Sequence, residues 1–391
     1  MAHRWFALLS LMCVLIASPL LAQQVCPGLS YVANTPEDEL MQEVNGAEKP
    51  EEQIAALDKF AQAHADSKFM PCVYEYYTMI YLNKLNNNDK AIEYGEKGLA
   101  SEHPTMNLLI NLSKAYVASG KTSDAILSAI LKAPDQIKTE TSPQKPPQVS
   151  DAEWEKTKQE MADQAKDETS YMVYAFFQLL PRVPDPHKRI EFLDGFVKAY
   201  PDAATANASQ LNYAYFIAYK MANQADKARE YGEKTIAADP NNILALNLLA
   251  YDYGIGQTNI EKASEYAKKA LDLAQAMKKP EGVSDEQFKR EQNSQLGMAR
   301  LTMGYVAYTK AAKTKRLGPA IQDLKEAAEL LEGNPELQGQ ALFYLGYAYE
   351  TIYPANHKGA IEALTKASNL QSAWQSQARE LLAKVKRAAH E

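Results

Sequence analysis

The residues that most often perform catalysis or bind metals lie far apart in this sequence. No HExxH, CxxC or GxSxG motif is present, and Gly254 and Gly256 lack the third glycine and the preceding strand of a dinucleotide-binding site. Carboxylates such as Glu93 stand four residues from a lysine, a spacing that favours ion pairs on a helix surface. The histidines outside the first 22 residues show no metal-ligand spacing; they are His64, His103, His187, His357 and His390. We therefore expect no enzyme activity, no metal and no cofactor.

Of the three cysteines, only two follow the apolar segment at the N-terminus. Cys13 lies inside that segment, whereas Cys26 and Cys72 come after it. In an oxidising compartment such a pair predicts a disulfide bond. The alternative is a reactive thiol, which is less favoured because no basic residue or histidine flanks either cysteine in the sequence.

The first 22 residues have the layout of a secretory signal peptide. His3 and Arg4 form a short basic region, an apolar run follows from Trp5 to Ala17, and Ala22 closes the segment. Cleavage after Ala22 predicts a periplasmic or secreted protein. The alternative is an uncleaved membrane anchor, although the apolar run is short for a membrane span. We expect no membrane span after cleavage, because no later segment is long and apolar enough.

Composition and charge narrow the fold class and the range of partners. The chain has 391 residues, and its 49 acidic and 42 basic side chains give a formal net charge of −7, which provides no electrostatic basis for binding nucleic acid. Hydrophobic residues make up 46% of the chain, as in folded proteins. Residues with high helix propensity dominate and strand patterns are absent, so an all-α fold is predicted.

Internal repetition is the strongest pattern in the chain. The sequence DKAIEYGEK at Asp89–Lys97 returns as DKAREYGEK at Asp226–Lys234, and KPPQVSDAEW at Lys145–Trp154 returns as KPEGVSDEQF at Lys279–Phe288. Both offsets are close to four times 34 residues, the period of paired-helix repeats. The predicted organisation is a signal peptide at 1–22, an N-terminal tail at 23–50, copies at 51–186 and 187–320, and a truncated copy at 321–391 with a C-terminal capping helix.

Single repeats of 34 residues resemble the tetratricopeptide repeat. Residues 209–242 contain two blocks with helical apolar spacing, separated by a polar turn and closed by Pro240. Thr235 and Gly98 depart from the family pattern, which prefers alanine there. Family positions are matched by Ala228, Leu249, Ala250, Tyr253, Ala263, Ala270, Leu345, Gly346, Tyr349, Ala360 and Ala367. The resemblance implies an α-solenoid, a superhelix of about seven to eight helical hairpins.

The repeated VSD sequence predicts the starts of two long helices. Ser150 and Ser284 are each followed three residues later by Glu or Gln, which is the capping-box pattern. Val149 and Trp154 stand at the positions of a hydrophobic staple. Capping explains the repeated residues, so this motif is predicted to be structural.

The resemblance also implies a line of aromatic side chains, which we call the tyrosine ladder. With Glu75, Ser113, Ser170, Asn212, Ala250, Gly304 and Gly346 at the family's small position, the next position reads Tyr76, Lys114, Tyr171, Tyr213, Tyr251, Tyr305 and Tyr347. Tyr174 and Tyr308 stand three residues further on in their helices. In the family these positions face the concave groove, so the ladder is a candidate ligand site. The alternative, that these rings pack between successive first helices, is favoured, since aromatic residues at helical spacing are usually packing residues.

These patterns together predict a function in binding. We expect a non-enzymatic scaffold or adaptor of the cell envelope that holds a protein or peptide in its concave groove. The alternative is a factor that binds cell-wall polysaccharide or another glycan through the same tyrosines. Two basic clusters could bind anionic lipid or an acidic partner, but a solvated face is the favoured interpretation; they are Lys310, Lys313, Lys315 and Arg316, and Lys384, Lys386 and Arg387.

Overall fold

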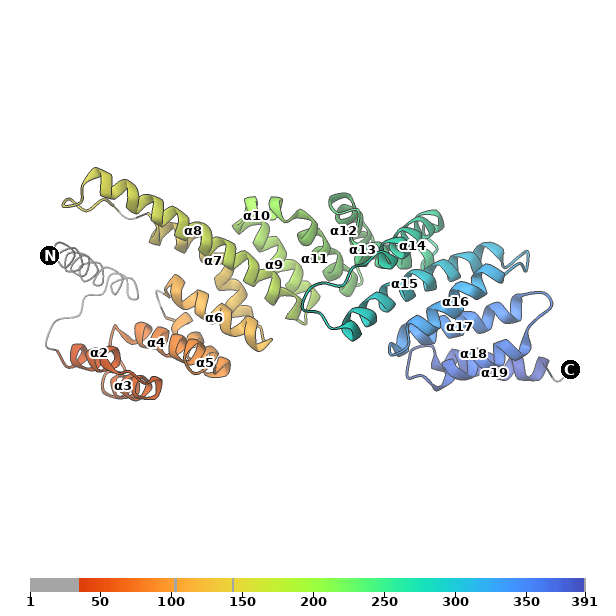
Figure 1. The fold of residues 1–391 in the computed structure, drawn as a ribbon, viewed down its shortest axis with the longest axis horizontal. Coiled ribbons are helices and arrows are strands. Elements are labelled where there is room, and N and C mark those ends of the chain that lie inside the picture. Colours follow the sequence, from red (N-terminus) through yellow and green to blue (C-terminus); the bar gives the residue numbers. More distant parts are fainter. Residues whose placement is uncertain (1–34, 102–103, 143, 390–391) are drawn as a thin grey trace, which may run out of the picture. The chain divides into compact units, whose positions relative to one another are not determined.

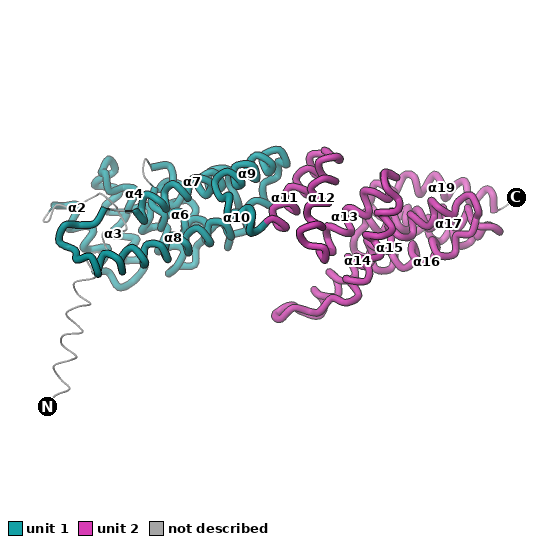
Figure 2. The backbone as a smooth tube through the Cα atoms, turned by 90° about the horizontal axis from the view of Figure 1, so that it is seen from above, with its two compact units in different colours: residues 1–207 teal, residues 208–391 magenta. Residues whose placement is uncertain are grey.

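The computed structural model describes residues 35–101, 104–142 and 144–389. Every regular element in these ranges is a helix. The chain divides after residue 207 into two compact units, which Figure 2 colours separately. The predicted signal peptide lies outside the described residues. None of the described helices is both long and apolar enough to span a membrane.

The first unit consists of helices that pack on their neighbours along the chain (Figure 1). They are α2 (Pro36–Gly46), α3 (Pro50–Ala63), α4 (Met70–Asn83), α5 (Asn88–Leu99), α6 (Met106–Ser119), α7 (Asp124–Glu140), α8 (Asp151–Leu179), the 3-10 turn η1 (Leu180–Arg182), α9 (Pro186–Ala199) and α10 (Pro201–Ala206). Besides these neighbouring contacts, α6 packs on both α4 and α8. The first helices of successive hairpins therefore form one layer of this unit.

The second unit repeats this arrangement. Its helices are α11 (Ala208–Met221), α12 (Ala225–Ala238), α13 (Ile243–Ile255), α14 (Ile260–Gln275), α15 (Asp285–Ala311), α16 (Gly318–Leu330), α17 (Pro335–Thr351), α18 (His357–Asn369) and α19 (Gln375–Ala388). The first helices α13, α15 and α17 pack on one another, and each also packs on the second helix that follows it. The predicted all-α fold of consecutive helical hairpins is thus confirmed.

The two predicted capping boxes are present at the starts of the two longest helices. The backbone N–H of Glu153 donates to Oγ of Ser150 (3.3 Å), and the N–H of Ser150 donates back to the Glu153 carboxylate (3.1 Å). Ser284 and Gln287 form the same pair at the start of α15. These contacts satisfy backbone groups that a helix end leaves unpaired. As a result α8 and α15 begin at equivalent positions of the two predicted sequence copies.

The repeated DKAxEYGEK sequence builds the same tyrosine stack in each unit. In the first unit the Tyr94 ring of α5 stacks on Tyr77 and Tyr81 of α4, with centroid distances of 4.1 and 5.5 Å. In the second unit Tyr231 of α12 stacks on Tyr215 of α11 at 4.6 Å. Lys97 lies 4.6 Å above the Tyr94 ring, and Lys234 lies 4.4 Å above Tyr231. The motif is therefore a device for joining the two helices of a hairpin.

Small residues let the helices of a hairpin approach closely. Gly346 of α17 faces Leu364 of α18, and a Cβ atom at Gly346 would lie 2.5 Å from Cγ of that leucine. Gly304 of α15 meets Leu324 of α16 in the same way, at 2.7 Å. Leu324 and Leu364 are both fully buried in the core of the second unit. This contact explains why the repeat prefers a small residue at this position.

The division into compact units follows different limits from the predicted sequence copies. The unit limit after residue 207 falls inside the copy predicted at 187–320. The helix α9, at the start of that copy, packs on α7 and η1 of the first unit. The copies begin with the second helix of a hairpin, so their limits cut through hairpins. They describe the sequence repetition and stay a prediction.

Candidate interaction surface

In the first unit, part of the tyrosine ladder lies together on α6 and α8. Lys114 Nζ lies 5.7 Å from the centroid of the Tyr171 ring, and the Tyr171 and Tyr174 centroids are 5.9 Å apart. Tyr76 contacts α2 instead, where its hydroxyl donates to Oδ1 of Asn45 (3.4 Å). Burial raises the pKa of Tyr171 to about 12, so its hydroxyl is a neutral hydrogen-bonding group. Tyr174 is 50% exposed, so the ladder reaches the surface of this unit at this residue.

In the second unit, the ladder residues connect first helices, both neighbouring ones and the more distant pair α13 and α17. The Tyr251 hydroxyl of α13 donates to Oε1 of Gln340 on α17 (2.9 Å). Tyr308 of α15 contacts Tyr347 of α17 with a centroid distance of 6.3 Å. Tyr305 is only 8% exposed, and Nε2 of Gln257 donates to its hydroxyl (3.0 Å). Packing between first helices therefore accounts for the burial of Tyr305 and for the hydrogen bond of Tyr251 to Gln340.

Tyr213 lies apart from these residues on α11. Its ring meets Phe216 of the same helix at 6.4 Å, and burial together with the nearby Glu291 carboxylate raises its pKa.

Tyr251 also borders a cavity of about 280 Å³ between the ends of α11, α12 and α13. Lys220 lines this cavity and forms an ion pair with Asp252, so its charge is already compensated. We assign no ligand to this cavity.

Three aromatic residues outside the predicted ladder complete the surface on α17. Phe343 and Tyr344 contact each other, and both contact Trp374, which precedes α19, at 5.2 and 5.3 Å. Tyr344 also contacts Tyr305 at 4.8 Å, and Phe343 contacts Tyr347 at 5.7 Å. We call this group the aromatic cluster; its members are Tyr305, Tyr308, Phe343, Tyr344, Tyr347 and Trp374.

Sequence reasoning missed the additional rings because it followed one repeat position. Phe343 and Tyr344 precede Tyr347 by one helical turn, and this spacing was the available signal. Trp374 gave no such signal, because only the packing of the segment before α19 brings it to α17. The cluster has one strongly exposed ring, Tyr347, at 44%. Phe343 is buried, and Tyr308, Tyr344 and Trp374 are half-buried.

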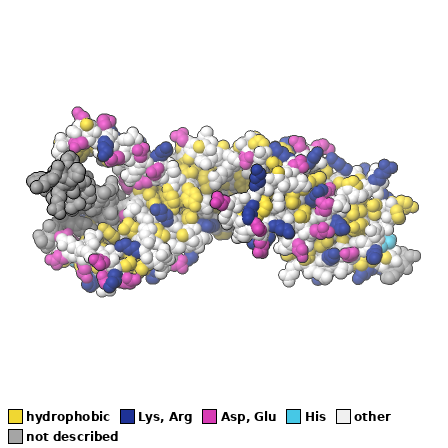
Figure 3. Space-filling view, viewed as in Figure 1, with side chains coloured by type: hydrophobic (Ala, Val, Ile, Leu, Met, Phe, Trp, Pro, Cys, Tyr) yellow, Lys and Arg dark blue, Asp and Glu magenta, His cyan; other side chains and the backbone are white. Residues whose placement is uncertain are grey.

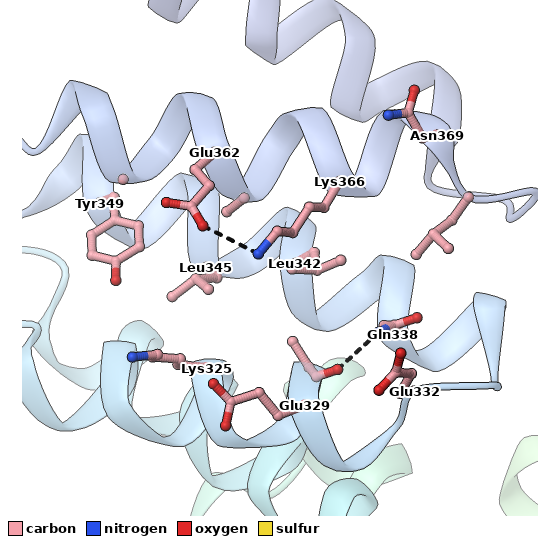
Figure 4. A pocket seen from close by; sticks show the side chains of 14 residues that line it. Lys325, Glu329, Glu332, Gln338, Leu342, Leu345, Tyr349, Glu362, Lys366 and Asn369 are labelled. Carbon is pink, nitrogen blue, oxygen red and sulfur yellow. Dashed lines mark hydrogen bonds and ion pairs between the residues drawn. The ribbon is translucent and has the colours of Figure 1, made fainter.

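The opposite face of α17 forms the floor of a groove between α16 and α18. Figure 4 shows this groove, which has a volume of about 610 Å³. Leu342 and Leu345 lie at its floor, and its walls carry both signs of charge, with Glu362 and Lys366 paired at 3.1 Å. The face differs from the aromatic cluster because residues 342 and 345 lie on the other side of the helix from 344 and 347. Three glutamates and two lysines line the groove, and this near balance gives no strong preference for an ionic ligand.

A buried carboxyl lies beside the tyrosine ladder of the first unit. Glu75 of α4 is 1% exposed, and burial raises the pKa of its carboxyl to about 7. The Thr105 hydroxyl donates to Glu75 Oε2 (2.6 Å), and the Asn107 amide donates to Oε1. Glu140 accepts a hydrogen bond from the backbone N–H of Met106 (3.2 Å). The two carboxyl groups hold the start of α6 between α4 and α7.

The described residues contain no group of three histidine, cysteine or carboxylate side chains placed to hold a metal ion. Cys72 is buried in α4 and is disulfide-bonded. The other cysteines, Cys13 and Cys26, lie outside the described residues. The predicted bond between Cys26 and Cys72 therefore stays a prediction.

No protein-family model matches this chain, and a search of curated proteins finds no match. Among solved structures, yeast Tom70 is similar with 13% identity over 90% of this chain and 95% of that chain, with a TM-score of 0.28. The APC/C hetero-tetramer Cut9-Hcn1 is similar with 12% identity over 95% of this chain and 93% of that chain, also with a TM-score of 0.28. Such TM-scores are too low for either structure to indicate the function of this chain.

Proposed function

We propose that this chain is a non-enzymatic interaction protein of the cell envelope. It binds a protein or peptide segment on the face that is formed by the first helices of its hairpins. The main contact surface is the aromatic cluster of the second unit. The observation that carries the proposal is the set of joined rings that ends at Tyr347, whose side chain is 44% exposed. Buried and half-buried rings hold Tyr347 in place, so a partner would meet an ordered apolar surface.

The chemistry of these rings favours a peptide over a strongly charged small molecule. Tyr308, Tyr344 and Tyr347 each offer an apolar face and a hydroxyl group, which suits contact with both side chains and backbone of a bound segment. Burial raises the pKa of Tyr344 to about 12, so its hydroxyl is neutral at physiological pH. A surface of this kind binds through shape and hydrogen bonds and needs no reacting group.

The location in the cell envelope is supported by the sequence. Residues 1–22 have the pattern of a secretory signal, and a disulfide-bonded Cys72 is typical of an oxidising compartment. Fractionation of cells that produce the full chain tests this location. Recovery of the protein in the cytoplasmic fraction, with the N-terminus intact, would contradict it.

Two tyrosines on one helix provide a matched pair of variants for the binding surface. Tyr347 belongs to the aromatic cluster, whereas Tyr349 lines the groove on the opposite face of α17. We expect Tyr347→Ala to lose the partner that the wild-type protein captures from envelope extract, with affinity reduced by about tenfold or more, as for aromatic contacts at the centre of an interface. Tyr349→Ala should retain that partner.

The comparison is made with purified partner once it has been captured, and circular dichroism must show equal helix content in all three proteins. Loss of binding in Tyr349→Ala alone would move the site to the groove between α16 and α18. Equal binding by all three proteins would contradict a site on the aromatic cluster.

The same exposed rings also fit a second function, the binding of a glycan. Flat aromatic faces such as that of Tyr347 can stack on sugar rings while their hydroxyl groups form hydrogen bonds. Saturable binding to purified cell-wall polysaccharide that Tyr347→Ala abolishes, with no protein captured, would favour this alternative.

A further inference from the structure

Four basic side chains gather where α15 ends and the chain turns into α16. They are Lys310, Lys313, Lys315 and Arg316, and all four are exposed. None of them forms an ion pair with another described residue. The chain as a whole has a net charge of −7, so this cluster is a local exception to the overall charge. Unpaired cations on an acidic protein steer anionic partners to one place.

An exposed tyrosine lies next to this cluster. Tyr353, which follows α17, is 79% exposed, the largest exposed fraction among the bulky hydrophobic side chains of the described residues. Lys315 Nζ lies 5.8 Å from the centroid of its ring. We call Tyr353 and the four cations the basic corner. The ends of α15 and α17 meet here, since the hydroxyl groups of Tyr308 and Thr351 are 3.4 Å apart.

The backbone at Lys315 has a left-handed conformation and places its side chain beyond the end of α15. Lys315 has a φ of 57°, in the left-handed region that L residues rarely adopt. The other described non-glycine residues with positive φ are amides, Asn86, Asn223 and Gln257. Asparagine tolerates this conformation, whereas lysine has no such preference. Asn86, Asn223 and Gln257 follow the first helices α4, α11 and α13, so a left-handed residue is a recurring end of these helices. After α15 this turn places a cation beside Tyr353.

Two ordinary explanations account for only part of the cluster. Basic residues in the last turn of a helix stabilise its dipole, which explains Lys310, but this effect fades within the last turn, and Lys315 and Arg316 lie beyond it. Glu350 of α17 contacts Nδ1 of His357 at 2.8 Å and forms no ion pair with any of the four cations. The remaining positive charge therefore faces solvent.

The basic corner continues the aromatic cluster. Tyr308 contacts Tyr347 at 6.3 Å, and Tyr308 also reaches Thr351, two residues before Tyr353. In Figure 3, hydrophobic side chains (yellow) lie beside basic ones (dark blue) on this part of the second unit. An apolar surface thus leads from Tyr347 toward Lys315.

We propose that the basic corner binds an acidic, extended segment of the protein partner, in which aspartate or glutamate residues alternate with an aromatic or aliphatic residue. The apolar residue would lie on Tyr353, and the carboxylates would pair with Lys315, Arg316 and the two helix-end lysines. This inference rests on the proposed function, because it names the charge of the segment that the aromatic cluster would hold. A peptide is favoured over a membrane surface because Tyr347 and Tyr353, the large hydrophobic residues exposed among the described residues of this region, have polar tips.

The test uses the mature protein and a fluorescent twelve-residue peptide in which pairs of glutamate alternate with phenylalanine. We compare Lys315→Glu/Arg316→Glu with the matched variant Lys384→Glu/Lys386→Glu, which makes the same change of net charge at the second basic cluster. The first variant should bind the peptide about tenfold or more weakly, and the second within about twofold of wild type, because charge at a contact matters more than net charge. Tyr353→Ala should weaken binding by about threefold to tenfold.

Several results would overturn this inference. Equal loss in the two charge-reversal variants would indicate attraction by net charge, and undiminished binding of a glutamine-for-glutamate peptide would show that carboxylates are not recognised. Binding to vesicles rich in phosphatidylglycerol that only Lys315→Glu/Arg316→Glu abolishes, without peptide binding, would make the corner a lipid site. The captured partner separates this inference from the proposed function. If capture depends on Tyr347 but not on Lys315 and Arg316, only the basic corner is contradicted. If the peptide binds at the corner but capture does not depend on Tyr347, only the aromatic cluster is contradicted.

Discussion

At the scale of single residues, the buried Glu75 carboxyl makes stability depend on pH. Its pKa in the folded protein is about 7, above the ordinary value of 4.5, because burial disfavours the charged form. The folded state therefore holds a proton that the unfolded state releases, and the contribution of Glu75 to stability falls as the pH rises from about 4.5 to about 7. The hydrogen bonds from Thr105 and Asn107 lower the pKa and oppose the effect of burial without cancelling it.

Replacing Glu75 with glutamine should remove this dependence. We expect Glu75→Gln to be more stable relative to wild type at pH 8 than at pH 5, by on the order of 2–3 kcal/mol. Urea unfolding at the two pH values measures the difference. Glu93→Gln is the control, since Glu93 is exposed and its pKa is lowered by Lys90 and Lys97. Equal behaviour of the two variants would show that Glu75 ionises freely in the folded protein.

At the scale of helices, the tyrosine stack explains why DKAxEYGEK occurs twice. Tyr94 joins α5 to α4 by stacking on Tyr77 at 4.1 Å, and Lys97 covers its other side. We expect Tyr94→Ala to destabilise the protein by about 2–4 kcal/mol, because it removes a ring that links the two helices. Tyr94→Phe, which keeps the stack, should cost less than about 1 kcal/mol. Thermal and denaturant unfolding measure both values.

Hydrogen exchange shows where the Tyr94→Ala variant loses stability. Protection should decrease in α4 and α5 and stay unchanged in the second unit, which has its own stack at Tyr231. Similar losses in Tyr94→Phe and Tyr94→Ala would mean that the hydroxyl group, and not the ring stack, holds the hairpin.

At the scale of the whole molecule, each compact unit carries its own buried core. The core cluster of the second unit includes Leu301, Leu324 and Leu364 together with aromatic residues packed against it. Because helical repeats are stabilised by neighbouring contacts, we expect residues 208–391 to fold alone with cooperative unfolding and native helix content. Circular dichroism and thermal unfolding of this fragment test the expectation.

A shorter fragment provides the contrast. A chain that begins at residue 260 lacks α11, α12 and α13, and the loss of α13 leaves Ala263, Ala267 and Ala270 of α14 without their covering helix. It should show less helix per residue than the fragment 208–391 and should tend to aggregate. Equal helix content and equal stability of the two fragments would contradict the importance of the α13–α14 hairpin.

The sequence by itself determined the features that depend on contacts between near neighbours along the chain. The helix starts at Ser150 and Ser284 follow from side chains within three residues of the cap, and the hairpins follow from apolar spacing over about 34 residues. The line of tyrosines could also be found in this way, because one repeat position carries it. Patterns of this kind need no knowledge of distant residues.

Only the tertiary structure decided which of these residues face a partner. Tyr305 and Tyr347 occupy the same repeat position, yet Tyr305 is buried between first helices and Tyr347 is exposed. Trp374 joins the cluster across 30 residues of chain. Glu75 acquires its raised pKa from burial, with a smaller contribution from the distant Glu140 carboxylate. Exposure and pKa depend on everything that packs around a side chain, and repeat position alone does not specify those neighbours.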